Sequence, residues 1–488
     1  MNRAAAVLNN QIVSLMLLAT LTLGGAYLVS RAATSVTALV VIGLAFGIVA
    51  FLRTEVAIYL IIVAMLLSPE IGMGEMTGQR EKGITLRFED YLLVIVGTAW
   101  FLKAAVYKEL NLLVRTHLNM PMALYAAACV LSTLLGMRPT GGVEPLEGSL
   151  FLLKYLEYFF LFWMVVNSIH DRKQIGRFLV VLFGVAFIVG MVAAVQIPSG
   201  LRVTAPFQGT HGEPNTFACY LLFVMVLALG VALSAPAYRW PLIALFCFLA
   251  VPFAYTLSRS AYVALAPSLF LLFFLTRRYL VMGVLCLAIA IALFSPATFL
   301  PPAVIDRITS TFGEEKVPGQ ISVEGQRFDS STEQRLEIFQ SALAAFREKP
   351  VFGWGITGWR FIDSQYFRVL VETGLVGFTL FLYLLYQVLR AGWSAMNRFR
   401  GRDPFLFGLA SGFFSAAFGL MIAALGANVF IIVRVMEPFW LVCAMLVSVT
   451  QMEAEQVPEP AVPGARLRRG TEAQRLADVR DRRVYGPV

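Results

Sequence analysis

Charged residues are scarce in this chain of 488 residues: Asp, Glu, Lys and Arg make up 14% of the sequence, whereas hydrophobic residues make up 58%. Soluble domains carry about 25% charged residues, so this composition excludes a soluble globular protein. The mean hydropathy of +0.74 points the same way. The sequence therefore predicts a protein that crosses a membrane several times.

Residue patterns for metal, nucleophile and disulfide chemistry are also missing. The chain has three histidines and five cysteines, and each cysteine falls within or at the edge of an apolar segment. No HExxH, GxSxG or paired-cysteine motif occurs. We expect no metal, no cofactor and no disulfide framework. The net charge of +9 lies mainly in short loops and the C-terminal tail, so we expect no nucleic-acid partner.

Long apolar segments are what the sequence has in abundance. A helical span needs about 20 apolar residues, and the chain holds enough for about 12 to 14 transmembrane helices. We therefore predict an all-α polytopic membrane protein. The candidate spans lie near 11–30, 34–52, 55–69, 89–107, 119–136, 150–168, 176–197, 216–233, 240–256, 260–276, 279–298, 365–390, 404–426 and 430–450.

Lysine and arginine in the short loops predict the orientation, because positive residues near span ends stay in the cytoplasm. They gather in four loops that share one side of the membrane if both termini are cytoplasmic. These residues are Lys103, Lys108, Arg115, Arg172, Lys173, Arg177, Arg277, Arg278, Arg390, Arg398, Arg400 and Arg402. We expect a membrane domain over 1–450, followed by a disordered, basic cytoplasmic tail over 451–488.

One connection, about 299–364, is much longer than the others, and this orientation places it outside. Within it, "STEQRLEIFQSALAAFREKP" predicts an amphipathic helix that begins with a Ser331–Gln334 capping box. The apolar stripe of that helix is predicted from Leu336, Phe339, Leu343 and Phe346. We expect the helix to lie on the outer membrane surface or over a cavity.

Three arginines are candidates for binding an anion. Arg259 lies between two apolar runs, where an Arg is costly unless it pairs or lines a wet cavity. Its guanidinium suits a phosphate; the alternative is a loop Arg that extends to lipid headgroups. Arg202 and Arg335 taken singly are typical surface residues. Together with Arg259 they are candidates for binding a diphosphate.

Two residues are candidates for a general base. His211 is the one histidine predicted outside, and a neutral imidazole suits proton abstraction, although a structural histidine in a Gly-Pro turn is the alternative. Asp363 precedes a long apolar segment, so it is either the N-cap of that helix or a carboxylate base. Asn215 is a candidate substrate contact or part of the N-cap region of the 216–233 span.

Two pairs of opposite charge lie at span ends. Arg368 and Glu372 are four residues apart, so they can pair and partly neutralise each other. Neutral residues would be less costly there, so both are also candidate substrate contacts. Lys154 and Glu157, three residues apart in the 150–168 span, predict a second, structural pair.

Several of these segments together resemble a known superfamily. "QRLEIFQSALAAFREKPVFGWGITGW" followed by "DSQYFRVLVETGLVGFTLF" resembles the signature region of O-antigen ligases and O-antigen or exopolysaccharide polymerases. "RVTAPFQGTHGEPNTFACYLL" and "LSRSAYVAL" are similar to its other recurring segments, in the expected order. The resemblance implies a glycosyltransferase type C-like bundle with one large periplasmic loop, in the bacterial inner membrane.

The resemblance also implies an activity: transfer of glycan from an undecaprenyl-diphosphate-linked donor to an acceptor hydroxyl at the periplasmic face, without a metal. The family's donor-binding arginines correspond to Arg259, Arg335 and Arg202. Ligases of the family usually have a His-Asn pair where this chain has Asp363 and Ser364. This departure favours a polysaccharide polymerase over a ligase that acts on lipid A core or protein.

The expected partners are the lipid-linked oligosaccharide and membrane lipids, with a flippase and a chain-length regulator as further candidates. A transporter of lipid-linked sugars is the alternative from another class. Many transporters are built from internal repeats, and no convincing repetition links the two halves of this sequence. The single long outer loop also favours an enzyme.

Overall fold

The structure, a computed structural model, describes residues 43, 45–68, 70–71, 86–106, 114–137, 142–207, 212–294, 305, 322–323, 326–327 and 330–456. The chain divides into two compact units, Met1–Val447 and Ser448–Val488. Of the second unit, only the last turns of one helix are described.

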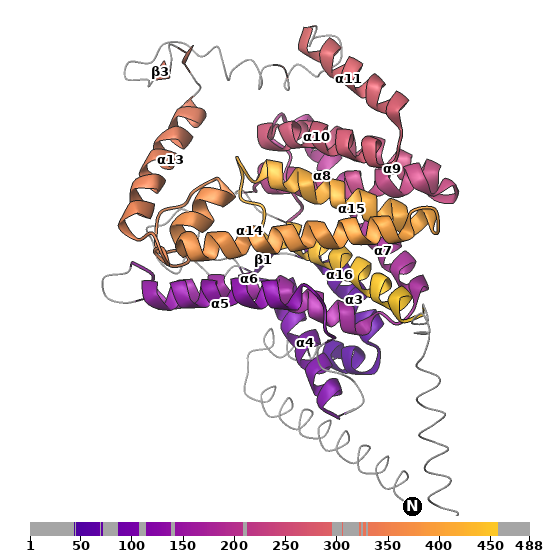
Figure 1. Cartoon of the computed structure of the whole chain (residues 1–488), viewed down its shortest axis with the longest axis horizontal. Coiled ribbons are helices and arrows are strands. Elements are labelled where there is room, and N and C mark those ends of the chain that lie inside the picture. The colour runs from indigo at the N-terminus through magenta and orange to yellow at the C-terminus, as the bar shows by residue number, and fades with distance from the viewer. Residues whose placement is uncertain are drawn as a thin grey trace, which may run out of the picture. The chain divides into compact units, whose positions relative to one another are not determined.

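The described part of the chain is built from α-helices, with two short hairpins (Figure 1). In each hairpin two strands of two residues pair antiparallel: β1 (Glu70–Ile71) with β2 (Leu86–Arg87), and β3 (Ser322–Val323) with β4 (Gln326–Arg327). The helices are α3 (Thr54–Leu67), α4 (Phe88–Val106), α5 (Asn119–Gly136), α6 (Pro145–Ser168), α7 (Arg172–Gln196), α8 (Pro214–Ser234), α9 (Arg239–Tyr255), α10 (Arg259–Leu275), α11 (Tyr279–Phe294), α13 (Ser330–Glu348), α14 (Gln365–Phe399), α15 (Pro404–Ala423) and α16 (Val433–Gln456).

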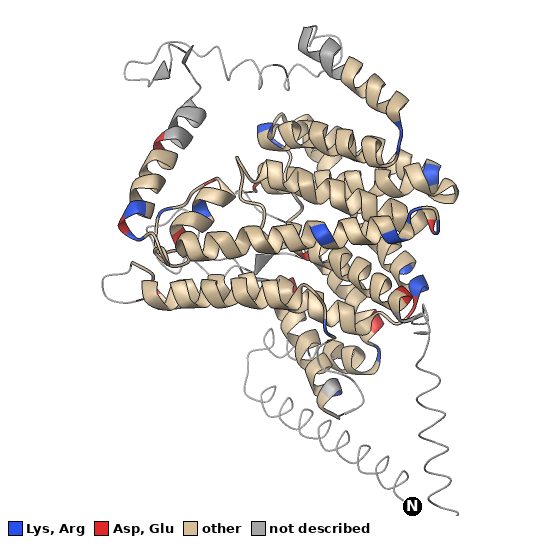
Figure 2. Ribbon diagram, viewed as in Figure 1, with Lys and Arg blue, Asp and Glu red and all other residues tan. Residues whose placement is uncertain are grey.

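The predicted class, an all-α polytopic membrane protein, is confirmed. Among the described residues, eight helices are long and apolar enough to cross a membrane, and α3 and α10 are shorter apolar helices. Charged residues gather at helix ends and in connections, whereas most of the helical surface carries none (Figure 2). That distribution is expected of helices that face lipid. The candidate span 11–30 lies outside the described residues.

Helix α8 lies at the centre of the bundle and packs closely against α15. Glycines allow the two backbones to approach: a Cβ at Gly230 would lie 2.5 Å from the Cα of Gly412. Without a hydrophobic driving force between helices in lipid, such small residues favour tight helix contacts. The same contact fixes α15, and with it the connection that leads to α16.

Helix α14 is broken, whereas the sequence predicts one continuous span over 365–390. Gly374 has φ 64° and ψ −167°, so residues 365–373 and 375–399 form two helical segments. The loop before α14 supplies hydrogen-bond partners at the break, because Trp354 N donates to Val371 O at 3.0 Å and Leu375 N donates to Pro350 O at 2.8 Å. The apolar periodicity continues across the glycine, which is why the pattern alone misses the break.

Gly374→Ala is expected to destabilise the protein by about 1 to 3 kcal/mol, because an alanine would be strained at this φ. Its Cβ would also lie 2.3 Å from Val351 O. The matched control is Gly176→Ala in α7, where a Cβ meets nothing within 4 Å. There alanine should be neutral or stabilising, by at most about 1 kcal/mol. Thermal unfolding of both purified variants checks this, and equal melting temperatures would contradict the strained break.

The C-terminal half of α13 covers the segment that leads into α14. Phe339 stacks on Phe367 with ring centroids 4.6 Å apart, and Trp354 Nε1 donates to Ala345 O at 2.9 Å. The predicted stripe is wrong at Leu343, which is 42% exposed. Small residues, among them Ala345, take the buried positions instead, because they let the helix approach the aromatic side chains closely.

Candidate functional site

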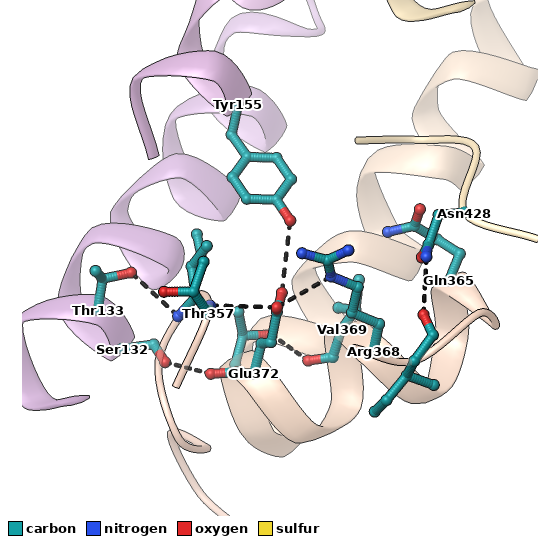
Figure 3. A network of polar contacts seen from close by, with 12 residues as sticks. Ser132, Thr133, Tyr155, Thr357, Gln365, Arg368, Val369, Glu372 and Asn428 are labelled. Carbon is teal, nitrogen blue, oxygen red and sulfur yellow. Dashed lines mark hydrogen bonds and ion pairs between the residues drawn. The ribbon is translucent and has the colours of Figure 1, made fainter. Parts of the chain in front are cut away.

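The pair Arg368–Glu372 lies in the short first segment of α14 and is buried. Arg368 Nε donates to Glu372 Oε1 at 3.0 Å, which confirms the predicted pair. Other elements hold the same carboxylate: Thr357 N donates to Oε1 at 3.3 Å, and the Tyr155 hydroxyl of α6 donates to Oε2 at 3.5 Å (Figure 3). The Glu372 side chain is therefore fixed by α6, by α14 and by the loop before α14.

The backbone at Glu372 is fixed as well. Its carbonyl accepts hydrogen bonds from Gly355 N at 2.8 Å and from the Ser132 hydroxyl of α5 at 2.6 Å. Gly353 is required nearby, since at its φ of 70° a Cβ would lie 2.5 Å from Val371 O. Rigid support of this kind is what holds a charged side chain in one geometry within a membrane.

Arg368 keeps part of its hydrogen-bonding capacity. Glu372 takes Nε, and the Phe361 ring lies 5.3 Å from the guanidinium carbon. Among the described residues, no hydrogen bond involves the terminal nitrogens Nη1 and Nη2 of Arg368. In Figure 3 the guanidinium lies between Tyr155 on one side and Gln365 and Asn428 on the other. A guanidinium oriented through Nε alone retains the two-pronged edge that suits a phosphate or carboxylate.

The structure brings three predicted residues together at a second place, the turn between α9 and α10. Arg202 Nε donates to Thr256 O at 2.9 Å, and Nη2 donates to Asn215 Oδ1 at 3.0 Å. Arg259, the first residue of α10, comes directly after this turn. Leu257, within the turn, has φ 50°, a conformation that is unfavourable without glycine and that concentrates at functional sites. Arg202 and Asn215 therefore hold the turn that presents Arg259.

The connection between α15 and α16, together with the first turn of α16, contacts both places; we call residues 424–434 the 424–434 connection. On one side, Gln365 N donates to Ala424 O at 3.1 Å and Asn428 Nδ2 donates to Ile362 O at 2.8 Å. On the other side, a Cβ at Gly426 would lie 3.5 Å from the Cβ of Ser260, the neighbour of Arg259. The start of α14 and the start of α10 thus flank one connection.

Asp363 lies between Ile362, which is bound to Asn428, and Ser364, which is the N-cap residue of α14. The N-cap alternative for Asp363 is therefore wrong by one residue, since the first helical residue is Gln365. Asp363 is partly exposed.

For two of the candidate site residues the structure does not describe the side chain. His211 lies outside the described residues, and Arg335 belongs to α13 by its backbone while its side chain is not described. The predicted pair Lys154–Glu157 is wrong. Lys154 Nζ instead contacts both oxygens of Asp90 in α4, at 2.9 and 2.8 Å, because a neighbouring helix offers a bidentate partner that spacing along one helix does not reveal.

Sequence reasoning missed Arg434 and Glu437 in the first turns of α16. Both are buried, with exposed fractions of 1% and 0%. Arg434 Nη1 donates to Pro206 O at 3.2 Å, which ties α16 to the segment that carries Arg202. The available signal was the charge itself, since ionisable residues within a span are rare and usually functional.

Comparison with known proteins bears directly on this arrangement. Residues 242–382 match the family model described as O-antigen ligase. This segment, which runs from α9 into α14, is therefore similar to the O-antigen ligase family. The match confirms the resemblance seen in the sequence and identifies a membrane enzyme of the glycosyltransferase type. The matched segment includes Arg259, Arg335, Asp363, Arg368 and Glu372. Among curated proteins, no significant match was found.

The family acts on lipid-linked glycans, and the geometry of the O-antigen ligase segment is compatible with such a substrate. The starts of α10 and α14 contact the 424–434 connection, Arg259 begins α10, and Asp363 lies just before α14. Arginine side chains can hold an anionic group, and a carboxylate can accept a proton from a reacting hydroxyl. Both kinds of group occur around one connection of the bundle.

Proposed function

We propose that this protein is a polysaccharide polymerase of the O-antigen ligase family. It transfers glycan from an undecaprenyl-diphosphate-linked donor to a sugar hydroxyl at the periplasmic face. One observation supports this proposal most strongly. The turn held by Arg202 and Asn215, which leads to Arg259, contacts one side of the 424–434 connection. The segment from Asp363 to Arg368 contacts the other side.

In this proposal the acceptor oxygen bonds to the anomeric carbon of the donor, and the bond from that carbon to the diphosphate oxygen breaks. Asp363 takes the hydroxyl proton as general base, with His211 as the alternative base. Arg259, Arg335 and Arg202 stabilise the diphosphate as its charge grows. Arg368 is oriented by Glu372 toward the same charge, and Asn215 holds Arg202 in place.

Product analysis tests the choice of polymerase. Purified protein in lipid vesicles would receive lipid-linked repeat units as both donor and acceptor. A ladder of products that differ by one repeat unit is the expected result. Transfer to lipid A core or to protein, without chain growth on the lipid-linked acceptor, would overturn it in favour of a ligase. The ligase remains the second candidate because the matching family model is described by that activity.

The transfer site is proposed to face the periplasm of the bacterial inner membrane, with both termini cytoplasmic. The lysines and arginines of the short loops support this orientation. Alkaline phosphatase, which is active only outside the cytoplasm, should be active when fused after Gln320 and inactive after Arg400. The reverse pattern would refute the orientation. A flippase that supplies the donor and a chain-length regulator are proposed partners.

A further inference from the structure

Glu437 is a buried carboxyl that has no role in the proposed transfer reaction. It lies in the second turn of α16, and none of its surface is exposed. Neither of its carboxylate oxygens has a hydrogen-bond partner among the described side chains and backbone groups. Burying an ionised carboxylate without a partner is very unfavourable. The charge on Glu437 therefore requires compensation.

The charged groups that act on Glu437 electrostatically come from two other helices. They are Glu157 and Lys154 of α6, and Glu89 and Asp90 of α4. Trp440, one turn further along α16, packs on the rings of Phe159 and Phe162 of α6, at 5.2 and 5.6 Å between centroids. This packing confirms that the same face of α16 is turned toward α6.

The nearby cations are already engaged. Lys154 Nζ lies 2.8 and 2.9 Å from the two carboxylate oxygens of Asp90. Arg434, one turn before Glu437, donates through Nη1 to Pro206 O at 3.2 Å, and no ion pair among the described residues joins it to Glu437. Glu157, which faces Glu437, has an oxygen, Oε1, that also lacks a partner within the described structure. Carboxylates that share a buried site cannot all ionise, since like charges repel strongly at low dielectric constant.

We propose that Glu437 is a proton-binding site of the folded protein: its carboxyl holds a proton at neutral pH, within the group formed by Glu89, Asp90, Lys154 and Glu157. The carboxyls are too far apart to bind a metal ion together, so the site binds a proton. Across the described residues, no three His, Cys, Asp or Glu side chains gather closely enough to hold a metal ion. A proton needs only one carboxyl.

The group also has a route for proton exchange. The side chains of Lys154 and Asp90 are 18% and 13% exposed, whereas Glu437 is completely enclosed. In this proposal protons exchange past the partly exposed Lys154–Asp90 pair, near the start of α4. This inference does not depend on the proposed transfer reaction, because its tests measure protonation and stability rather than polymer formation.

Infrared difference spectroscopy tests the proposal on the full-length protein in lipid. At neutral pH the wild type should show a protonated-carboxyl band that shifts in heavy water. Glu437→Gln should lose part of the band, and Glu144→Gln, at an exposed position before α6, should retain it in full. An unchanged band in Glu437→Gln, or no band in the wild type, would overturn the proposal.

Stability provides a second readout. If the folded chain holds a proton that the unfolded chain releases at neutral pH, folding takes up a proton and stability falls as pH rises. Above the pKa of an ordinary glutamate, about 4.3, this proton contributes up to about a tenfold rise in the unfolding constant per pH unit. Glu437→Gln, which keeps the shape of the protonated form, should lose that slope. Equal slopes in the two proteins would refute the site.

Discussion

Asp363→Asn is expected to lower the rate of polymerisation by about 10² to 10⁴ while the protein folds as before. The acceptor hydroxyl must lose its proton as the diphosphate leaves, and an amide cannot accept that proton. The structure sharpens this expectation, because Ser364 rather than Asp363 is the N-cap residue of α14. Loss of activity in Asp363→Asn can therefore not be attributed to a lost helix cap.

The matched control is Ser364→Ala at the adjacent N-cap position. The Ser364 side chain makes no capping hydrogen bond, so this variant should retain most activity and stability. Rates would be measured with purified lipid-linked repeat units, and folding by thermal unfolding. Full turnover in Asp363→Asn rejects the base assignment. Loss in His211→Ala alone would transfer the role to His211.

Arg259→Ala is the second large expected loss. Removing a charge-assisted contact to the donor diphosphate is worth about 2 to 3 kcal/mol, which is roughly a 30- to 150-fold loss in rate. Arg259→Lys should rescue little, because an ammonium cannot reproduce the planar guanidinium. Arg335→Ala is expected to show a comparable loss.

The control for Arg259 is Arg278→Ala, just beyond the opposite end of α10, where the exposed side chain donates to Leu233 O at 2.9 Å. It removes an equal charge next to the same helix and should leave the rate nearly unchanged. All variants would be compared at equal amounts of inserted protein. Wild-type rates in both Arg259→Ala and Arg335→Ala would refute the proposed diphosphate site.

The sequence predicts the helices well because a span is a local property. For α5 the predicted range 119–136 equals the observed Asn119–Gly136, and most other spans agree within a few residues. The break at Gly374 could not be predicted in the same way. A single glycine is common in membrane helices, and its φ is imposed by the loop that packs against it.

The sequence identifies most residues of the candidate site but few of the contacts between them. The Arg368–Glu372 pair follows from a spacing of four residues. The contact of Arg202 with Asn215 arises from the packing of a connection against α8, and that of Lys154 with Asp90 from the packing of α6 against α4. Glu437 was missed because counting apolar windows passes over one or two charges, although in a membrane each charge carries information.

The most direct test of the account follows the donor lipid. Wild-type protein in vesicles treated with a metal chelator would receive undecaprenyl-diphosphate-linked repeat units, and both glycosidic linkages and free undecaprenyl diphosphate would be quantified over time. The account predicts one free undecaprenyl diphosphate for every linkage formed, and far less of both in Arg259→Ala. Movement of the lipid-linked glycan across the bilayer with its diphosphate linkage intact, and no linkage formed, would contradict it.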